Sequence, residues 1–421
     1  MIGEQARPMA CNPPAWHLGV VSVFLLIAGA GSQAPLPPNH DEARLLLQLK
    51  SHLTDASGRL GNWNLSMDDG GAPCTWAGVR CSAALSGSGS TPPVQVTSLD
   101  LSGMALSGTI SPAIGALVGL TSLDMSYNRL FGAIPPEIGN CINLVRLELH
   151  HNRLHGRIPP HLGNLSALVT CHLHTNKLHG PIPSEIGDMA SLERLALYNN
   201  SLSGPLPRSI GKLKNLRTLR LGGNLISGNI PDEICECQSL VHLGLANNHL
   251  QGPLPREIGR LSLLEELYLY VNHLSGAIPW EIGNCTNLRK MALYNNNLVG
   301  PMPTTLGNLR YLEWLYLYKN SLNGTIPPVL GNLSLLIEVD ISENFLTGEI
   351  PKELGDIPGL HLLQLFTNKL QGSIPKEIGN LSRLEHINLS KNLLTGRIPE
   401  ELGNIRGLAS LGLSSNLLTG F

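Results

Sequence analysis

The chain has 421 residues, with 29 basic and 31 acidic side chains and a formal charge of −2. That balance does not indicate binding to nucleic acid or to an acidic membrane surface. Gly (45) and Pro (30) are plentiful and aromatic residues make up only 4%, but the 42% of hydrophobic residues recur regularly and favour an ordered fold over disorder.

Residues 1–34 are predicted to be a secretory signal peptide. The run from Leu18 to Ala30 is apolar, has the length of a signal-peptide core and is too short to span a bilayer. Small residues at 28–30 and 32–34 offer two cleavage sites. An apolar terminus buried in the fold is the alternative. No later stretch is long and apolar enough for a membrane helix.

Residues 35–93 precede a repetitive region and form a separate N-terminal segment. They contain a predicted amphipathic helix over 41–53 (DEARLLLQLKSHL), then Trp63, then CTWAGVRC from Cys74 to Cys81. The stretch SGSGS at 86–90 is interpreted as a flexible loop, because it lacks the surrounding pattern of a phosphate-binding loop.

From residue 94 to 421 the sequence repeats with a period of 24. The pattern LxxLxLxxN ends on an anchor asparagine, and Met104 takes that place in a recognisable first repeat, so there are 14 repeats, the last one incomplete. A glycine follows each anchor position by four residues. The anchors are Asn128, Asn152, Asn176, Asn200, Asn224, Asn248, Asn272, Asn296, Asn320, Asn344, Asn368, Asn392 and Asn416.

The slots of one repeat predict its structure. In the fifth repeat, Leu195 and Leu197 alternate with polar or small residues, as in a short strand with one buried face. Asn200 lies where the strand turns, and its amide is expected to satisfy backbone groups of neighbouring repeats. Gly204 permits backbone geometry that a Cβ would obstruct, and Pro207 stiffens the return. Because no repeat buries its leucines alone, the repeats must stack into a parallel sheet about 60 Å long.

The repeat, as in LERLALYNNSLSGPLPRSIGK, resembles the plant-specific leucine-rich repeat, and residues 41–81 resemble the N-terminal cap of plant receptor kinases. The resemblance runs from about residue 41 to the end and is closest to the peptide-sensing receptor kinases. It implies an α/β-type leucine-rich-repeat solenoid: a right-handed superhelix with a concave parallel sheet and an N-terminal cap. It also implies a disulfide between Cys74 and Cys81, which fits an oxidising compartment.

The same resemblance implies an extracellular, non-enzymatic recognition scaffold that binds a secreted peptide or a cell-wall-derived ligand, with a co-receptor ectodomain as a further partner. The family continues with a C-terminal cap, a membrane helix and a kinase. We interpret this chain, which ends at Phe421 within a repeat, as a truncated form of a membrane-anchored receptor, located outside the cell. A short secreted form is the alternative.

The other cysteines do not suggest a disulfide framework or a metal centre, and no cofactor is expected. Cys141, Cys237 and Cys285 occupy one repeat slot, which predicts a semi-buried packing role. Cys171 takes a core leucine slot, and Cys235 takes a glycine slot without partner ligands for a metal.

Eight Asn-x-Ser/Thr sequons predict surface glycans on a secreted protein. Four of them share a slot twelve residues past the anchor, away from the strand. The plain alternative is that GNLS and GNCT are repeat consensus. The sequons are at Asn64, Asn164, Asn199, Asn284, Asn323, Asn332, Asn380 and Asn388.

Motifs of known enzyme classes are missing: there is no HExxH, GxSxG, P-loop or dinucleotide-binding fingerprint. Asp100, Asp124 and Glu148 fall in one column of adjacent strands, so their carboxylates are expected about 5 Å apart. Retaining glycosidases place their two catalytic carboxylates at about that distance. Catalysis also needs a cleft that shifts one pKa, and an open sheet does not supply one. We therefore expect no enzyme activity.

Aromatic residues gather on the solvent-facing columns of the predicted sheet, where large rigid side chains make binding hot spots. Three neighbouring strands carry six of them, which we predict to form an aromatic platform for a peptide; half-exposed strand tyrosines without a ligand are the alternative. The platform is Tyr268, Tyr270, Tyr294, Trp314, Tyr316 and Tyr318.

Arg220, Gly222 and Gly223 form an Arg-x-Gly-Gly element. It resembles an element that some receptors of the family use for a sulfated tyrosine, since a guanidinium fork matches an anion and paired glycines leave room beside it. Histidines also crowd the third and fourth repeats, and His150 and His174 share a column. We interpret these histidines as a solvated surface.

Two other functions compete with the peptide receptor. A secreted inhibitor of pathogen cell-wall-degrading enzymes uses the same repeat in fewer copies, and a non-functional fragment is the third reading. A transcript that continues into a membrane helix and kinase would separate them.

Overall fold

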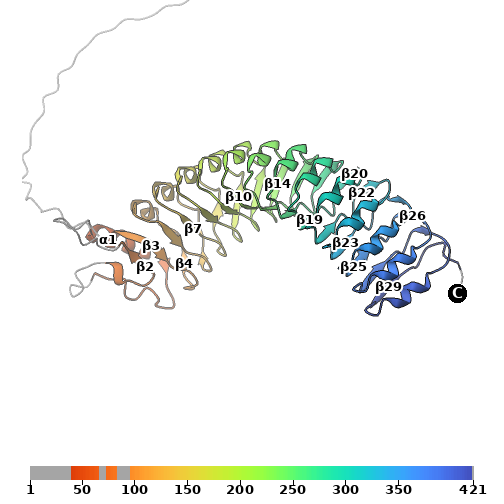
Figure 1. Cartoon of the computed structure of the whole chain (residues 1–421). Coiled ribbons are helices and arrows are strands. Elements are labelled where there is room, and N and C mark those ends of the chain that lie inside the picture. The colour runs from red at the N-terminus through yellow and green to blue at the C-terminus, as the bar shows by residue number, and fades with distance from the viewer. Residues whose placement is uncertain (1–38, 66–72, 83–94, 420–421) are drawn as a thin grey trace, which may run out of the picture. The chain divides into compact units, whose positions relative to one another are not determined.

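The computed structural model describes residues 39–65, 73–82 and 95–419, all within one compact unit that begins at Pro37. The repeats of this unit stack side by side along an arc (Figure 1). The predicted signal peptide (1–34) and the loop at 86–90 lie outside the described residues. No helix of the described part is long and apolar enough to cross a membrane.

A sheet of 15 strands runs the length of the unit, and its strands β3 to β29 are all parallel. Only β2, from the cap, pairs antiparallel, with β3. The strands, in spatial order, are β2 (Val79–Cys81), β3 (Val96–Asp100), β5 (Ser122–Asp124), β7 (Arg146–Glu148), β9 (Thr170–His172), β11 (Arg194–Ala196), β13 (Thr218–Arg220), β15 (His242–Gly244), β17 (Glu266–Tyr268), β19 (Lys290–Ala292), β21 (Trp314–Tyr316), β23 (Glu338–Asp340), β25 (Leu362–Gln364), β27 (His386–Asn388) and β29 (Ser410–Gly412).

A second set of short strands lies beside the first, split into sheets of three, eight and three strands. Its members are β1 (Leu53–Thr54), β4 (Ser107–Gly108), β6 (Arg129–Leu130), β8 (His155–Gly156), β10 (Lys177–Gly180), β12 (Ser201–Gly204), β14 (Leu225–Asn229), β16 (His249–Gly252), β18 (His273–Gly276), β20 (Asn297–Pro301), β22 (Ser321–Asn323), β24 (Thr347–Gly348), β26 (Lys369–Gly372) and β28 (Leu393–Leu394).

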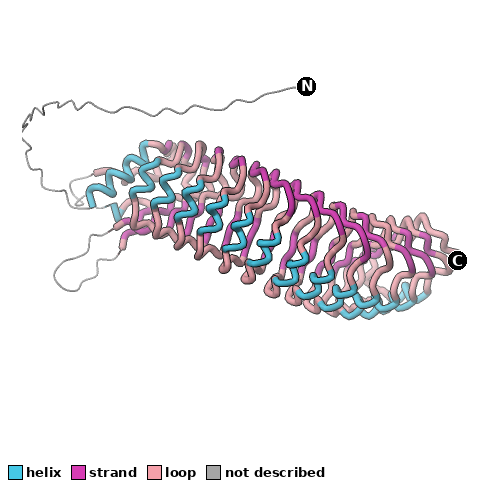
Figure 2. Tube along the Cα trace, turned by 90° about the horizontal axis from the view of Figure 1, so that it is seen from above, coloured by secondary structure: helices cyan, strands magenta, loops and turns pink. Residues whose placement is uncertain are grey.

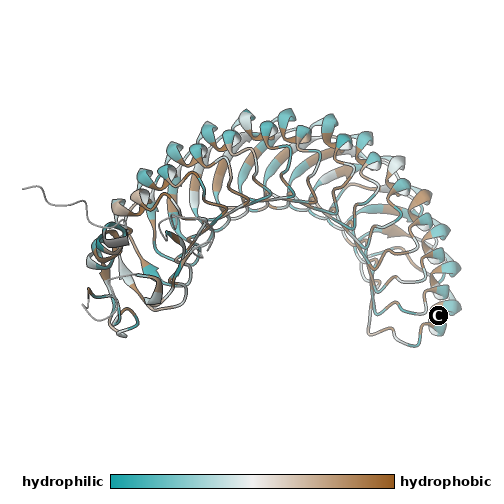
Figure 3. Ribbon diagram, turned by 60° about the vertical axis from the view of Figure 1, so that its left-hand side comes forward, coloured by the Kyte–Doolittle hydropathy of each residue, from teal (hydrophilic) through white to brown (hydrophobic). Residues whose placement is uncertain are grey.

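Each of the first 13 repeats closes with a 3₁₀ helix that starts after the slot predicted to hold proline. Figure 2 shows these helices as a continuous row, and in Figure 3 they form the outer rim of the arc, with the long sheet on the concave side. They are η3 (Pro112–Ala116), η4 (Pro136–Asn140), η5 (Pro160–Asn164), η6 (Ser184–Asp188), η7 (Arg208–Lys212), η8 (Asp232–Glu236), η9 (Arg256–Arg260), η10 (Trp280–Asn284), η11 (Thr304–Asn308), η12 (Pro328–Asn332), η13 (Lys352–Asp356), η14 (Lys376–Asn380) and η15 (Glu400–Asn404).

Residues that pair across neighbouring strands of the long sheet are 24 residues apart, which is the period of the sequence. Leu195 pairs with Cys171 on one side and Leu219 on the other, each 24 residues away, and all three side chains are fully buried. Leucines and isoleucines of every repeat thus meet their counterparts in the next and form one continuous core. The predicted leucine-rich-repeat solenoid is confirmed.

The anchor asparagines form the ladder that the sequence predicts. Asn272 Oδ1 accepts from the backbone N–H of Leu250 (3.0 Å), and Nδ2 donates to the carbonyls of Leu245 (3.1 Å) and Leu269 (3.0 Å). The same bonds recur from Asn128 to Asn416, so each amide ties its own strand end to the preceding repeat. Most anchors are buried, while those at 152, 176, 200, 368 and 416 are half-buried.

The repeat needs glycine at two positions, for different structural reasons. Gly204 has φ +79°, a left-handed conformation that favours glycine. Gly187, in a 3₁₀ helix, has an ordinary φ, but a Cβ there would lie 2.3 Å from the carbonyl oxygen of Ser209 in the next repeat. One glycine therefore permits the turn, and the other permits close stacking.

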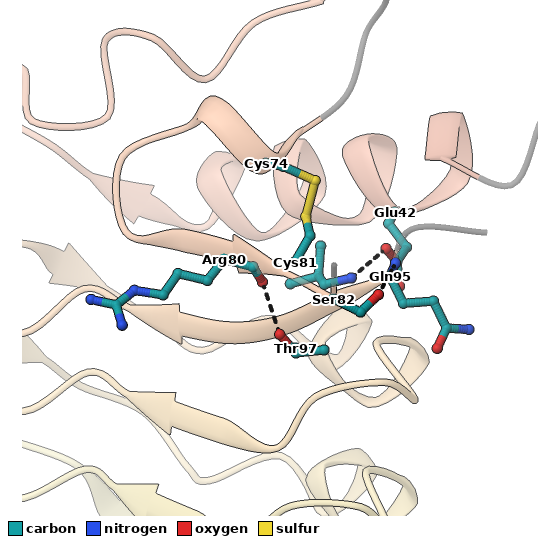
Figure 4. Close-up of a disulfide and its surroundings, with 8 residues drawn as sticks. Glu42, Cys74, Arg80, Cys81, Ser82, Gln95 and Thr97 are labelled. Atoms are coloured by element: carbon teal, nitrogen blue, oxygen red, sulfur yellow. Dashed lines mark hydrogen bonds between the residues drawn. A yellow bond between two sulfur atoms is a disulfide. The ribbon is translucent and has the colours of Figure 1, made fainter. Parts of the chain in front are cut away.

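The N-terminal cap covers the first edge of the core (Figure 4). Helix α1 (Asn39–Ser51) ends two residues before the predicted boundary, because the chain then enters β1. The rings of Trp63 and Trp76 stack with centroids 5.7 Å apart. Glu42 accepts from the N–H of Val96 (2.8 Å) at the start of the first repeat, and burial raises the pKa of its carboxyl.

Of the cysteine predictions, the cap disulfide is confirmed: Cys74 and Cys81 are bonded. The semi-buried role of Cys141, Cys237 and Cys285 is wrong, because all three are at most 1% exposed. Their thiols donate to carbonyls of the preceding repeat, for example from Cys237 to Ile210 (3.1 Å). Burial raises the pKa of Cys237 to about 11, which makes the thiol unreactive.

The ladder gives a direct stability prediction. Asn272→Ala removes the bonds to Leu245, Leu250 and Leu269 and leaves buried backbone groups without partners. We expect a loss of about 3 kcal/mol in the free energy of unfolding, measured by urea denaturation. Asn297→Ala, at an exposed position, is the matched control and should change it by less than about 0.5 kcal/mol. Equal losses for both variants would contradict the role of the ladder.

Candidate functional site

Two columns of side chains on the concave sheet carry most of the candidate residues. We call the positions two residues before each anchor the first column, and the positions four residues before it the second column. The first column reads His150, His174, Tyr198, Gly222, Ala246, Tyr270, Tyr294 and Tyr318. The second column reads Glu148, His172, Ala196, Arg220, Gly244, Tyr268, Ala292 and Tyr316.

Small residues interrupt both columns at the same place. In the first column Gly222 and Ala246 separate Tyr198 from Tyr270, and in the second Gly244 stands between Arg220 and Tyr268 in direct register. The result is a hollow of about 450 Å³, which we call the concave hollow. It is lined by Tyr198, Asn199, Arg220, Gly222, Gly223, Gly244, Ala246, Asn247, Glu266, Tyr268 and Tyr270.

Gly244 forms an open part of the floor. A Cβ there would meet nothing closer than Arg220 Cγ at 3.7 Å, so the fold does not demand glycine at this position. Gly223 has φ +66°, but other repeats place His151, Thr175 or Asn247 in the same left-handed conformation. The backbone therefore does not require glycine at 223 either. What these glycines contribute is space.

Glu266 lies at the edge of the hollow, close to three basic side chains. Its carboxylate lies 3.7 Å from Arg220, 3.1 Å from His242 Nδ1 and 3.3 Å from Lys290. The Arg220 side chain is 50% exposed, whereas that of Glu266 is 18% exposed. Of the two permanent cations beside this carboxylate, Arg220 lines the hollow and Lys290 lies outside it. The most accessible charged group of the hollow is the Arg220 guanidinium.

The hydroxyl of Tyr268 is held in its neutral form. Burial, and then the carboxylate of Glu266, raise the pKa of Tyr268 to about 12. This phenol therefore stays a hydrogen-bond donor throughout the physiological pH range.

Beyond the hollow, the first column continues as a stack of three tyrosines. The ring centroids of Tyr270 and Tyr294 are 4.5 Å apart with an interplanar angle of 5°, and those of Tyr294 and Tyr318 are 4.3 Å apart with an angle of 9°. The rings cover one another's faces and are half-buried. The predicted platform is therefore one contiguous patch, but it offers ring edges rather than open faces.

Trp314 and Tyr316 flank this stack from strand β21. The Lys290 ammonium lies 4.4 Å from the centre of the Trp314 ring, a cation–π contact. The Tyr316 hydroxyl donates to Glu338, and burial with that bond raises the pKa of Tyr316. Both side chains already have partners on neighbouring strands, so they are held in fixed positions.

The histidine-rich surface differs from the sequence prediction. His174 is only 7% exposed and stacks on Tyr198 with centroids 4.1 Å apart, and His150 packs edge-on against it at 4.5 Å. Burial lowers the pKa of His174 to about 3, and burial also lowers that of His150. The prediction of a solvated surface is wrong for His174 and His150. Their neutral rings form an aromatic layer that continues from Tyr198, at one side of the hollow. His155, His161 and His179 are exposed, as expected.

The carboxylate column is confirmed as a column. Asp100, Asp124 and Glu148 pair in direct register. Each is engaged locally: Asp100 and Asp124 accept from serines two residues on, at 2.7 and 2.6 Å, and Glu148 lies 2.8 Å from His172. The arrangement gives no acid–base pair facing a common cleft.

The sequon asparagines are mostly exposed, as predicted, but two differ in environment. Asn199 lines the concave hollow, so a glycan there would stand at its rim. Asn388 is half-buried and its Oδ1 accepts from the backbone and hydroxyl of Ser390.

The structure brings together only part of the predicted ligand-binding set. Arg220, Gly222, Gly223, Tyr268 and Tyr270 line the hollow, while Tyr294, Trp314, Tyr316 and Tyr318 lie along the adjoining surface. The sequence interpretation did not identify Tyr198, Gly244, Ala246 and Glu266 as site residues. Reading the two columns along the repeats, instead of counting aromatic residues, would have revealed the interruption.

A capped solenoid of 24-residue repeats around an asparagine ladder defines a leucine-rich repeat protein. The model described as the leucine rich repeat N-terminal domain matches residues 39–82, and the leucine rich repeat model matches eight segments between 119 and 405. The chain therefore belongs to the leucine-rich repeat family.

Its curated relatives are plant receptor kinases. A probable leucine-rich repeat receptor-like protein kinase of Arabidopsis thaliana is 50% identical over 82 residues, 19% of this chain and 7% of that protein. The probable inactive leucine-rich repeat receptor kinase XIAO of Oryza sativa subsp. japonica is 40% identical over 88 residues, 21% of this chain and 7% of that protein. The matches thus span a small part of these relatives.

Solved structures agree on the fold. A TDR receptor has a TM-score of 0.73 and 32% identity, covering 76% of this chain and 56% of its own. The ectodomain of the receptor kinase GASSHO1/SCHENGEN3 from Arabidopsis thaliana has a TM-score of 0.51 and 28% identity, covering 89% and 62%. A Leptospira interrogans LRR protein has a TM-score of 0.57 and 32% identity, covering 76% and 90%.

The buried phenols predict a delayed alkaline titration. The pKa values of Tyr198, Tyr268, Tyr294, Tyr316 and Tyr318 are raised, chiefly by burial. Because the unfolded chain ionises first, the free energy of unfolding should fall as the pH rises from about 10 through 12 and should not depend on these groups below that window. Phenolate absorbance at pH 11 should be lower in the native chain than in the chain unfolded by guanidinium. Identical titration curves would contradict the half-buried placement.

Proposed function

We propose that this chain is the ligand-binding extracellular part of a receptor-like kinase, and that the concave hollow takes a side chain of an extended secreted peptide. The observation that carries the proposal is the coincident gap in both columns, between Tyr198 and Tyr270 and between Arg220 and Tyr268. The fold has no need of the gap, since other repeats fill these positions with tyrosine, histidine or carboxylate.

The chemistry of the hollow favours a ligand group that is both planar and anionic. Tyr198 and Tyr270 provide aromatic walls on either side, and Arg220 supplies a guanidinium that is half exposed. An anion that approaches Arg220 competes with Glu266, but Lys290 remains to neutralise that carboxylate. A sulfated or otherwise acidic aromatic side chain fits this combination, in line with the Arg-x-Gly-Gly resemblance.

The rest of the peptide is proposed to lie across the tyrosine stack towards Trp314. A rigid patch of Tyr294, Tyr318, Tyr316 and Trp314 loses little side-chain entropy on binding, because stacking and hydrogen bonds already fix its rotamers. The neighbouring structure of GASSHO1/SCHENGEN3 is of an ectodomain in complex with CASPARIAN STRIP INTEGRITY FACTOR 2, which shows that this fold accepts a ligand in that receptor. A co-receptor ectodomain remains a proposed second partner of this chain.

Filling the hollow tests the proposal. In Gly244→Leu the added Cβ meets no neighbour closer than 3.7 Å and the rest of the side chain extends into the hollow, so we expect the fold to tolerate it while the hollow is blocked. We expect the affinity for the cognate peptide, measured by calorimetry, to fall by at least about tenfold, or about 1.4 kcal/mol. Gln364→Leu, in the same column outside the hollow, should leave affinity unchanged. Full binding by the Gly244 variant would show that the hollow is not the site.

Truncating side chains of the aromatic patch tests the second part of the proposal, namely that the peptide lies across the tyrosine stack towards Trp314. Trp314→Ala and Tyr316→Ala should each weaken peptide binding by about 2 kcal/mol, roughly thirtyfold, because aromatic anchors dominate such interfaces. The measurement is calorimetry on a complete ectodomain, with circular dichroism to verify folding. Unchanged affinity in folded variants would mean that the aromatic side chains serve only the sheet surface.

A further inference from the structure

A row of cations lies at the start of the second set of strands, in β6 and β10 and two residues before β8, away from the concave hollow. Arg129, Arg153 and Lys177 each follow an anchor asparagine by one residue, in three consecutive repeats. Backbone bonds from Arg153 N–H to Leu130 and from Lys177 N–H to Leu154, both 2.8 Å, place each residue one strand from the next. We call these three residues the basic row.

The surroundings of the basic row are also cationic or neutral. The positions two residues further along each repeat hold Phe131, His155 and His179, and Arg157 follows His155 by two residues. All of these side chains are exposed. Acidic residues of the same repeats lie elsewhere, on the concave columns or on the 3₁₀ helices: Asp124, Glu137, Glu148, Glu185 and Asp188.

No ion pair within the described residues involves Arg129, Arg153, Arg157 or Lys177. Cations on and just after the 3₁₀ helix η7 behave differently: Arg208, Lys212 and Lys214 pair with acidic groups at 2.8, 3.0 and 2.9 Å. In register Lys177 pairs with His155 and Arg129 with Ser107, so successive cations of the row are diagonal neighbours and not directly opposite. Exposed cations without an ion-pair partner attract counter-ions from solution. The basic row is thus a charge arrangement that the fold itself leaves uncompensated.

We propose that the basic row binds an unbranched polysaccharide that carries regularly spaced carboxylates. One cation per repeat, in a single line, matches a polymer with evenly spaced anions better than the irregular carboxylates of a protein surface. The Phe131 ring, 49% exposed at one end of the row, offers an apolar contact for a sugar face. This surface is separate from the concave hollow, so the proposal does not depend on a peptide ligand.

The test uses the purified chain and polygalacturonate oligomers in biolayer interferometry at low and physiological salt. Fully methyl-esterified oligomers give the same sugars without the charges, and poly-glutamate gives the charges on a polypeptide. We expect polygalacturonate to bind and the two control polymers to bind at least tenfold more weakly. Binding should weaken as salt rises, because these charges are exposed.

A variant with Arg129→Gln, Arg153→Gln and Lys177→Gln should lose at least tenfold in affinity for polygalacturonate. The matched variant Arg208→Gln, Lys212→Gln and Lys214→Gln removes the same charge from η7 and the residues just after it, and should bind as the unchanged chain does. Single substitutions at Arg153 serve if the triple variant is unstable. Equal binding by both triple variants, equal binding of methyl-esterified oligomers, or stronger binding of poly-glutamate would each overturn the proposal.

Discussion

The asparagine ladder is the interaction on which the whole solenoid depends. Every repeat turns sharply after its strand, and the turn exposes backbone groups that have no partner within the repeat. From the second repeat on, one buried or half-buried amide per repeat satisfies them, as Asn272 does for Leu245, Leu250 and Leu269. Because each amide reaches into the preceding repeat, the bonds hold the strand ends of adjacent repeats in a fixed register.

The ladder divides the positions of a repeat into those that the fold constrains and those at which the side chain can vary. The buried leucines, the anchors and the close-stacking glycines are fixed by the ladder, whereas the two columns on the concave sheet carry residues of any kind. A binding site in this architecture is therefore made by variation along a column. The concave hollow illustrates this, since three small residues, Gly222, Gly244 and Ala246, create it without any change in the backbone. The basic row uses the same freedom on the second set of strands.

The repeats, the ladder, the parallel sheet and the cap were predictable from sequence, because each depends on a strictly periodic slot. The contacts that side chains make with neighbouring repeats were harder to predict from the sequence. The thiol of Cys237 was expected to be semi-buried, but the small slot turns it fully inward to the carbonyl of Ile210. His174 was expected in solvent, but its ring stacks on Tyr198, one strand further along. Such contacts depend on which rotamers meet across strands, and periodicity does not encode that choice.

The concave hollow itself was only half predicted. Arg220, Gly222 and Gly223 were identified by resemblance and Tyr268 and Tyr270 by their aromatic character, but as two separate features. Their union depends on Gly244, a residue with no side chain to attract notice in a sequence. Conversely, Tyr294 and Tyr318 were expected to be exposed side chains, and mutual stacking leaves them half-buried.

The central claim is that the concave hollow receives an extended peptide, and site-directed photo-crosslinking tests it most directly. A benzophenone amino acid placed at Tyr270 faces the hollow, and one placed at Trp280, which is 59% exposed on the 3₁₀ helices, serves as the control. After exposure to extracellular fluid and irradiation, mass spectrometry identifies the attached chain. The account predicts a short secreted peptide at position 270 and none at 280. Capture of an intact wall-degrading enzyme at 270, or the same products at both positions, would contradict it.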